Sequence, residues 1–414
     1  MVVPSLLREN LQFRRFWLGQ TVSLLGDQVS LIAVPLVAVL TLDASAAQMG
    51  YLVAAELAPN LLFSLHAGAW ADRRARKRQI MIATDLGRAG LIGSLPLAYA
   101  FDALTFPHML VVAFLMGSLS VLFQVAYGPL YVALVPRDRL IEGGSIMHGS
   151  RALSYVAGPS IGGLLVQAIS APVTLVVDAC SYVVSALFLR SVVAEEPPPE
   201  APGKGHVVAG VRWVFGNAIV RAALGATATI NFFNFVFFAL FILYANRSLG
   251  VEPGTLGLVL GAGAVGGVLG ALVTGRIAAR IGVGPAFAVG CVVFPAPLLL
   301  VPLAEGPRWV ILACLFLAEF GSGFGVMMLD ISAGAILAAV IPDRLRSRIS
   351  GAYTVVNYGV RPLGALAGGA LGSWIGLRET LWIATAGALA GFLWLLPSPI
   401  LGLRELPEPE EGGT

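Results

Sequence analysis

The stretch GAWADRRARKRQ, residues 68–79, places one acid and five bases between two long apolar segments. The acid is Asp72, and the bases are Arg73, Arg74, Arg76, Lys77 and Arg78. Across all 414 residues, 57% are hydrophobic and only 12% are charged. A soluble globular protein carries about twice that share of charge. We therefore interpret the charged cluster as a short loop between two membrane-spanning helices.

Apolar segments long enough to cross a bilayer recur along the whole chain. A spanning helix needs about 20 predominantly apolar residues. Twelve such segments are separated by short polar breaks, and we predict an all-α membrane protein with twelve transmembrane helices. The predicted spans are 14–40, 48–70, 79–101, 107–134, 143–168, 172–193, 219–245, 254–279, 285–304, 308–339, 348–373 and 379–402. The first is too long for a cleaved signal peptide, so we expect it to be retained as a helix.

The basic residues set the expected orientation of these spans. If the N-terminus is cytoplasmic, the outer loops carry only Arg247, Arg308 and Arg378, and the other loop bases fall on the inner side. The positive-inside rule then places both termini in the cytoplasm. We expect a monomer in the cytoplasmic membrane of a bacterium, in contact with lipid and with no nucleic-acid partner.

An internal repeat divides the chain into two parts. Gly68, Asp72 and Arg73 recur as Gly275, Ala279 and Arg280, and VPRDRL (135–140) recurs as IPDRL (341–345). Between the copies lies EEPPPEAPGKGH, typical of a flexible linker, and then VVAGVRWVFGN, which can form a short interfacial helix. The predicted domains are an N-terminal six-helix half 1–194, a cytoplasmic linker 195–217, a C-terminal six-helix half 218–402 and an acidic cytoplasmic tail 403–414.

In a chain with twelve predicted spans and an internal repeat, GAWADRRARK resembles the loop 2–3 signature of the major facilitator superfamily, G-x-x-x-D-R-x-x-R-[KR]. GRIAARIG (275–282) is similar to its weaker second copy, with Ala279 in place of the acid. The resemblance covers nearly the whole chain and implies two pseudo-symmetric halves and a loop that latches their cytoplasmic ends in the outward-facing state. Asp72 could accept hydrogen bonds from a helix N-terminus near residues 347–351. The latch residues so implied are Gly68, Asp72, Arg73, Arg76, Gly275 and Arg280.

A second stretch resembles one branch of that superfamily. AGPSIGG (157–163) is similar to the G-P-x-x-G-G end of the signature of drug:proton antiporters, with Ser145 and Ser154 where the two upstream glycines would stand. VSLLGDQVSLIAVPL (22–36) resembles exporters that include macrolide-efflux and enterobactin-export proteins. The residues of the AGPSIGG motif so implied are Gly158, Pro159, Gly162 and Gly163. The alternative is that these residues only kink the fifth span and pack it closely.

Ionisable residues inside the spans are the strongest candidates for function, because burying them is costly. Asp27 lies about 20 Å into the first span and Glu56 about 12 Å into the second, counted from opposite ends at about 1.5 Å per residue. Burial favours the neutral form of a carboxyl group, so each can load and release a proton. A structural role is the alternative for both. Asp85 and Arg88 are spaced i, i+3, so we expect them to satisfy each other.

We expect the substrate cavity to be lined by aromatic side chains, which supply apolar contact area, and by polar side chains, which orient the substrate. Arg151 can neutralise Asp27 or Glu56, and Arg361 can neutralise Glu319 or Asp330; either arginine can instead contact substrate. The alternative is that the aromatic residues of these spans line no cavity and face lipid or a neighbouring helix. The cavity candidates are Gln124, Tyr127, Arg151, Asn231, Asn234, Glu319, Asp330 and Arg361.

Several other site classes are not supported by the sequence. GAGAVG (261–266) matches a dinucleotide-binding pattern but lies inside an apolar span and follows no soluble strand. No Walker loop is present, and the histidines and cysteines show no metal-ligand spacing. We therefore expect no cofactor, no metal site and no enzymatic activity.

Together these features predict a proton-coupled exporter of hydrophobic or amphipathic small molecules, such as drugs or siderophores, that works by alternating access. Within transport, the alternative is a translocator of lysophospholipids or other lipids. The alternative from another class is a ligand sensor with a transporter fold that moves nothing.

Overall fold

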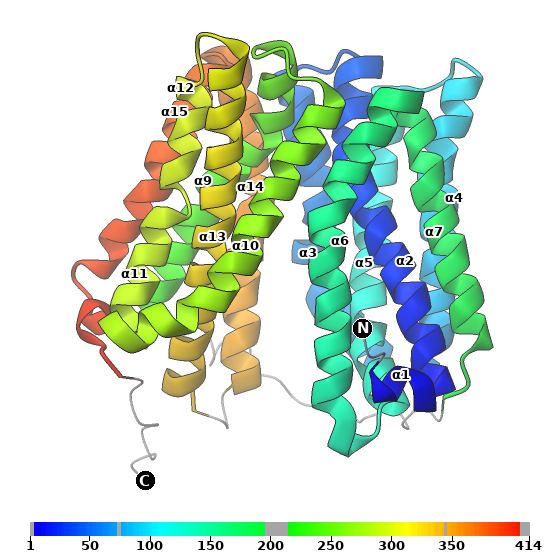
Figure 1. Cartoon of the computed structure of the whole chain (residues 1–414), viewed down its shortest axis with the longest axis horizontal. Helices are drawn as coiled ribbons and strands as arrows, with labels where there is room; N and C mark the ends of the chain where they lie inside the picture. Colours follow the sequence, from blue (N-terminus) through cyan, green and yellow to red (C-terminus); the bar gives the residue numbers. More distant parts are fainter. Residues whose placement is uncertain (1–3, 73–75, 195–213, 343–345, 406–414) are drawn as a thin grey trace. The chain divides into compact units, whose positions relative to one another are not determined.

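The computed structural model describes residues 4–72, 76–194, 214–342 and 346–405, and these ranges contain helices but no strands (Figure 1). Nine helical segments in them are long and apolar enough to cross a membrane. Every one of the twelve predicted spans falls on one helix or on two or three consecutive helical elements of the structure. The predicted all-α class is therefore confirmed. Most of the predicted interfacial helix, 207–217, lies outside the described residues.

The first half of the chain forms a short N-terminal helix followed by six long ones. Their bounds are α1 (Ser5–Glu9), α2 (Leu11–Leu36) continued by the π-helix η1 (Val37–Thr41), α3 (Ala46–Asp72), α4 (Lys77–Ala100), α5 (Phe106–Leu134), the 3-10 turn η2 (Arg137–Arg139), α6 (Leu140–Ile169) and α7 (Ala171–Ser191). This pattern follows from the bilayer, since a helix satisfies its backbone hydrogen bonds internally.

The second half repeats the pattern with two broken helices. Its elements are α9 (Ala218–Arg247), α10 (Pro253–Ile281), α11 (Val283–Val293), η3 (Ala296–Leu299), α12 (Leu300–Leu303), α13 (Arg308–Val340), α14 (Arg346–Trp374), α15 (Leu377–Ala390), η5 (Gly391–Leu395) and η6 (Pro399–Gly402). The break after α11 coincides with Pro295 and Pro297, which cannot donate backbone hydrogen bonds.

The helices pack into two compact units whose boundaries cross α3 and α10. Unit 1 consists of Met1–Ala44, Ala55–Gly203 and Glu252–Gly261, and unit 2 consists of Ser45–Ala54, Lys204–Val251 and Ala262–Thr414. The first turns of α3 thus group with unit 2, and those of α10 with unit 1. The division into halves at 194 and 218 stays a prediction.

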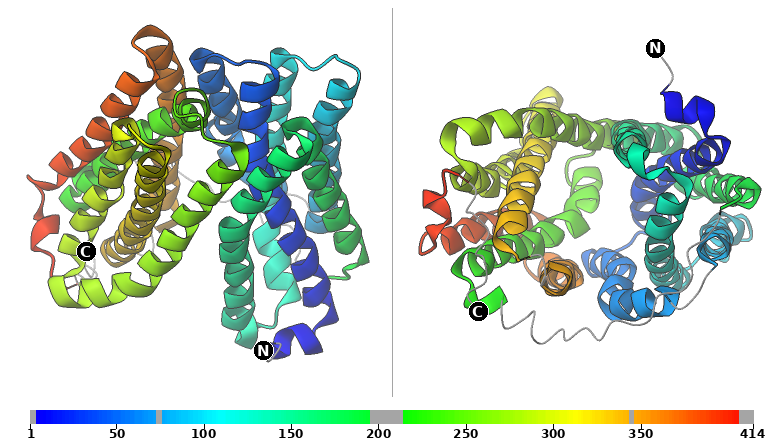
Figure 2. Two further views of the ribbon diagram at one scale, coloured as in Figure 1. Left: turned by 45° about the horizontal axis from the view of Figure 1, so that its top comes forward. Right: turned by 90° about the horizontal axis from the view of Figure 1, so that it is seen from below.

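Within unit 1, α2 packs along both α6 and α7, and α4 packs against α5 and α7 (Figure 2). Gly158 and Gly162 of α6 make the first contact possible. A Cβ atom on Gly162 would lie 3.0 Å from the Cα of Val29, and one on Gly158 would collide with the Cβ of Gln28. Two of the four residues predicted for the antiporter motif therefore bring α6 close to α2, while a role in coupling stays a prediction.

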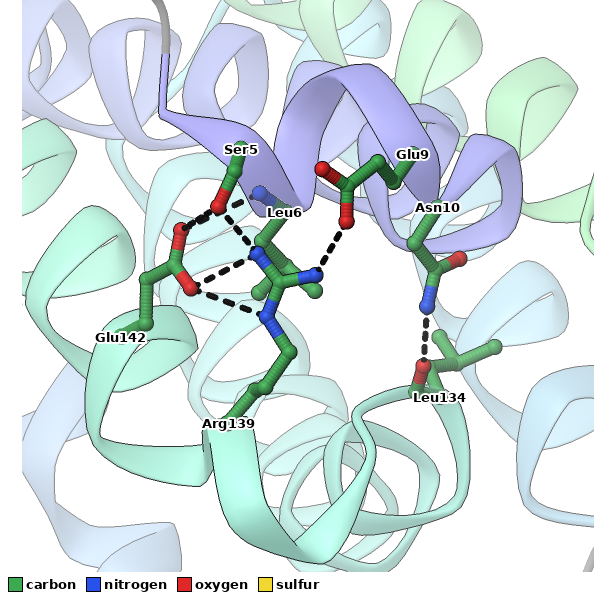
Figure 3. A network of polar contacts seen from close by, with 7 residues as sticks. All are labelled: Ser5, Leu6, Glu9, Asn10, Leu134, Arg139 and Glu142. Atoms are coloured by element: carbon green, nitrogen blue, oxygen red, sulfur yellow. Dashed lines mark hydrogen bonds and ion pairs between the residues drawn. The ribbon is translucent and has the colours of Figure 1, made fainter.

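A polar network ties the N-terminal helix α1 to the turn between α5 and α6 (Figure 3). Arg139 donates to both Glu9 and Glu142, each at 2.8 Å. Glu142 also accepts from the backbone N–H of Leu6 at 3.1 Å, and Asn10 donates to the carbonyl of Leu134 at 2.9 Å. The first copy of the repeated VPRDRL segment thus anchors the chain's N-terminal turn. The core of its second copy, 343–345, lies outside the described residues.

In unit 2, α9 packs against α14 and α15, and α11 packs against α13. Close approach again depends on glycine, because a Cβ on Gly364 of α14 would collide with the carbonyl of Phe232, and one on Gly368 would press on Val236. Small residues of this kind let helix backbones pack tightly where lipid offers no hydrophobic drive.

We expect Gly158→Ala to destabilise the protein by roughly 1–3 kcal/mol through overpacking against α2. Gly149 on the same helix has no atom within 4 Å of its Cβ position, so Gly149→Ala should leave stability unchanged or slightly raised. Thermal unfolding of the detergent-purified variants measures both. Equal melting temperatures for the two variants would contradict the packing described for α2 and α6.

Candidate functional site

The interface between α2 and α7 contains the first predicted proton carrier. Asp27 of α2 is half-buried and accepts a hydrogen bond from the hydroxyl of Tyr182 on α7, at 2.5 Å. Tyr182 itself is 3% exposed. Gly26, beside Asp27, leaves room for α7, because a Cβ there would collide with the side chains of Ser181 and Asp178. The missing side chain therefore positions the acid against its partner.

A second carboxyl group, Asp178, lies one turn before Tyr182 and is 0% exposed. It accepts hydrogen bonds from Ser30 of α2 and from Ser181 at 3.1 Å. Two turns after Asp178 on α7, Ser185 accepts a hydrogen bond from the side chain of Gln20 on α2 at 3.3 Å. The helix pair is thus joined by polar contacts over several turns, and its buried acids have hydrogen-bond donors.

Helix α4 brings a third acid and a cation to the same place. Arg88 forms an ion pair with Asp85, as the i, i+3 spacing predicts, and the two residues are 4% and 0% exposed. The guanidinium lies over the rings of Phe123 and Tyr182, with its Cζ 4.3 and 4.5 Å from their centroids. Arg88 Nε and one oxygen of Asp85 are buried without a hydrogen-bond partner. The pair is therefore only partly satisfied by its own helix.

We call Asp27, Asp85, Arg88, Asp178 and Tyr182 the buried acidic network. Arg88 interacts electrostatically with all three acids. Within the network three carboxyl groups thus share a single cation. Because an unpaired buried charge is costly, such a group holds together best when some of its carboxyl groups carry protons.

Glu56, the second predicted proton carrier, lies on the part of α3 that belongs to unit 1. Its side chain is exposed, and it interacts electrostatically with Asp27. The backbone carbonyl of Glu56 is close to Gly117 of α5, where a Cβ would collide with it. The two predicted acids therefore do approach each other, and both are more accessible than Asp85 and Asp178.

The other cavity candidates of unit 1 lie on α5 and α6. Tyr127 packs on Phe16 and Tyr131, with ring centroids 5.5 and 6.4 Å apart, and Gln124 is exposed. Arg151 is half-buried and interacts electrostatically with Tyr127. In the described part of the chain Arg151 forms no ion pair within 4.0 Å, with Asp27 and Glu56 included.

In unit 2 the structure gives the two asparagine candidates different surroundings. Asn231 of α9 donates to the side chain of Asn357 on α14 at 2.7 Å and to the carbonyl of Thr227 at 2.9 Å. Asn357 in turn donates to the hydroxyl of Thr227 at 3.1 Å. The side chain of Asn231 therefore links α9 to α14. Asn234, on the same helix, is half-buried.

The charged candidates of unit 2 lie on α13 and α14. Arg361 of α14 lies against Tyr358 and Phe235, and Asp330 of α13 is exposed. Glu319 is half-buried near Gly263 of α10. Asp330 influences Arg361 electrostatically, but neither it nor Glu319 forms an ion pair with Arg361 within 4.0 Å.

The structure describes the predicted latch only in part. Arg73 is not described, and for Gly68 and Asp72 only the backbone, in α3, is described. Arg76 and Arg280 are exposed, and Gly275 has no atom within 4 Å of its Cβ position. The latch stays a prediction.

Tyr182, Ser30, Ser181 and Asp178 were not among the site residues predicted from the sequence, and Asp85 and Arg88 were expected only to satisfy each other. One signal was available, since Asp178, Ser181, Tyr182 and Ser185 recur at i, i+3, i+4 and i+7, which marks a polar stripe on one helix face. Asp27 and Ser30 share a face of α2 in the same way.

Comparison with known proteins places the chain among membrane transporters. The sequence model of the Major Facilitator Superfamily matches residues 16–365 and, in a second match, 223–412. The chain is 27% identical over 383 residues to the multidrug efflux pump Tap of Mycolicibacterium fortuitum, covering 86% of this chain and 88% of Tap. It is 28% identical over 384 residues to the enterobactin exporter EntS of Escherichia coli, covering 89% of this chain and 87% of EntS.

Among solved structures, the nucleoside transporter NupG has a similar fold. Its TM-score is 0.77 at 11% sequence identity, covering 93% of this chain and 99% of NupG. At that identity the likeness concerns the fold alone.

We expect Arg88→Gln to destabilise the protein by roughly 3–5 kcal/mol at neutral pH, because it leaves buried carboxylates without their cation. The double variant Arg88→Gln/Asp85→Asn should recover much of this loss. Protonation of the acids should also reduce the loss at pH 5. Thermal unfolding at both pH values measures the effects, with Arg137→Gln on the exposed η2 turn as the control. A pH-independent effect, or no recovery in the double variant, would contradict the shared-cation arrangement.

Proposed function

Because the chain belongs to the Major Facilitator Superfamily, we propose that it is a secondary active exporter that exchanges small amphipathic molecules for protons. Members of this superfamily are transporters, so the prediction that the chain is not an enzyme is confirmed. The efflux pump Tap and the exporter EntS, similar along most of the chain, support outward transport. Drugs and siderophores are the substrate classes that these two relatives suggest.

The charge balance of the buried acidic network supports proton coupling. Arg88 can neutralise one carboxylate, and two further negative charges at this depth would be unfavourable in a bilayer. Asp27 is the most accessible of the three acids in the network. It is therefore the acid best placed to exchange a proton with water, while Asp85 and Asp178 stay buried. Glu56, which is exposed and electrostatically coupled to Asp27, is the second candidate.

Protonation of Asp27 can be converted into movement through its two partners. When ionised, Asp27 accepts the hydrogen bond of Tyr182 and attracts Arg88. When protonated, it attracts Arg88 much less, so Arg88 interacts mainly with Asp85 and Asp178. The packing of α2 against α4 and α7 then differs in free energy between the two protonation states. A proton shifts a conformational equilibrium only through such a difference.

Transport would follow the alternating-access scheme, in which the two halves, 1–194 and 218–402, rock around a central site. Residues 68–79 would latch the cytoplasmic ends, and both termini would lie in the cytoplasm. The positive-inside pattern and the loop signature support these assignments.

We expect the parent protein to raise the inhibitory concentration of at least one macrolide, dye or other hydrophobic toxin in an efflux-deficient bacterial strain. Asp27→Asn should abolish this resistance at matched membrane levels. Asp138→Asn, which removes an exposed acid from the η2 turn, should retain it. Full resistance with Asp27→Asn would exclude Asp27 as the proton carrier, and no resistance to any compound would move the search to secreted metabolites, siderophores and lysolipids.

We further expect a difference between two transport modes in proteoliposomes. Asp27→Asn should abolish substrate movement driven by a pH gradient but retain counterflow of radiolabelled substrate, because counterflow needs the conformational cycle but no net proton transfer. If the parent protein binds a compound but shows no counterflow, it is a ligand sensor and not a transporter.

A further inference from the structure

Arg361 is a cation inside a predicted span that, among the described residues, has no carboxylate at ion-pair distance and is held by aromatic rings instead. In the described parts of the chain it forms no ion pair within 4.0 Å, and its Nε is buried without a hydrogen-bond partner. Asp330 acts on it only at longer range. Charged groups in membrane helices are normally paired or belong to a functional site. The absence of pairing therefore requires an explanation.

Aromatic rings surround the guanidinium where acids would be expected. Its Cζ lies 3.9 Å from the ring centroid of Tyr358 and 5.3 Å from that of Phe235. These contacts orient the planar guanidinium and remove part of its hydration, but they leave its positive charge in place. A guanidinium held in this way is prepared for a planar anion, to which it can donate two parallel hydrogen bonds.

The backbone around Arg361 is held rigidly by two kinds of contact. One turn before it, Asn357 accepts the hydrogen bond of Asn231, and Phe235 follows Asn231 by one turn on α9. Just after it, Gly364 brings α14 close to the carbonyl of Phe232. The arginine and its aromatic partners are therefore positioned in advance, which lowers the entropic cost of binding a ligand.

The protein does not fully cover the side chains of this site. Tyr358 is 44% exposed, Asp330 is exposed and Arg361 is half-buried. Arg361 and Asp330 would be costly on a lipid-facing surface, so their exposed sides are better explained by water or substrate.

We propose that Arg361, Tyr358 and Phe235 bind the anionic group of the substrate, so that the transported compounds are aromatic or amphipathic anions. Asp330 acts as the competing internal anion, which is weakly engaged when the site is empty. This inference rests on the proposed export of small amphipathic molecules and narrows it to one chemical class.

Direct binding tests this without any transport or proton coupling. The probes are anthracene-9-carboxylate and its neutral analogue 9-anthracenemethanol, measured by equilibrium dialysis against the full chain in phosphatidylcholine nanodiscs, with empty nanodiscs subtracted. A charge-assisted hydrogen bond changes a dissociation constant by about tenfold or more. We therefore expect the carboxylate to bind more tightly than the alcohol by at least this factor.

Two substitutions should act in opposite directions. Arg361→Gln should remove the preference for the carboxylate, whereas Asp330→Asn should strengthen carboxylate binding by removing the competing charge. Arg276→Gln, which removes an exposed arginine of α10, should change neither. If Arg361 only stabilised the fold, Asp330→Asn would weaken binding of both probes or leave it unchanged. The opposite sign of the Asp330→Asn effect keeps the test decisive even if Arg361→Gln does not fold.

The remaining outcomes separate this inference from the proposed function. Equal affinity of the parent protein for the two probes would overturn the anion site, whatever the transport assays show. Loss of carboxylate binding on adding phosphatidylglycerol to the nanodiscs would assign the arginine to a lipid headgroup and also overturn it. Asp27→Asn should keep the carboxylate preference, so a failure of proton coupling would leave the anion site standing.

Discussion

The compensation of Arg88 is the constraint on which the packing of unit 1 depends. A guanidinium that is 4% exposed must recover its lost hydration from the protein. Asp85 supplies a carboxylate, and the rings of Phe123 and Tyr182 lie against the guanidinium, with centroids 4.3 and 4.5 Å from its Cζ. These partners come from α4, α5 and α7, and Asp27 of α2 also interacts electrostatically with Arg88. A change at any one of these helices therefore alters how well the charge is satisfied at the others.

The same contacts that hold α2 and α7 together carry the titratable groups. Helices in lipid gain little from apolar contact with one another, so small residues and hydrogen bonds contribute much of their specificity. Gly26 admits α7, Ser30 bonds to Asp178, and Tyr182 bonds to Asp27. In the proposed exchange, protonation of Asp27 would change its hydrogen-bonding capacity and with it the strength of this interface. The residues that join the two helices would then also carry the proton.

The buried acidic network of unit 1 and the surroundings of Arg361 in unit 2 have opposite charge balances. In unit 1 the carboxyl groups of the buried acidic network outnumber its cation, an arrangement suited to taking up protons. In unit 2 Arg361 is held by aromatic rings and lacks a close acid, an arrangement suited to an anion. The two sites fit the proposed exchange of protons for organic anions, and each can be tested by its own substitution.

The sequence by itself determined the helices and one local pair. Spans of about 20 apolar residues can satisfy their backbone in lipid only as helices, so the twelve segments follow from composition and length. The pairing of Asp85 with Arg88 follows from spacing on one helix. Only the tertiary structure decided that Tyr182 meets Asp27, that Asn231 bonds to Asn357 and that Phe235 covers Arg361. These partners lie on different helices. A polar stripe such as that of α7 marks one helix face, but the sequence does not show which neighbouring helix that face meets. That choice is made by the rotation and register at which glycines and polar groups allow the helices to pack.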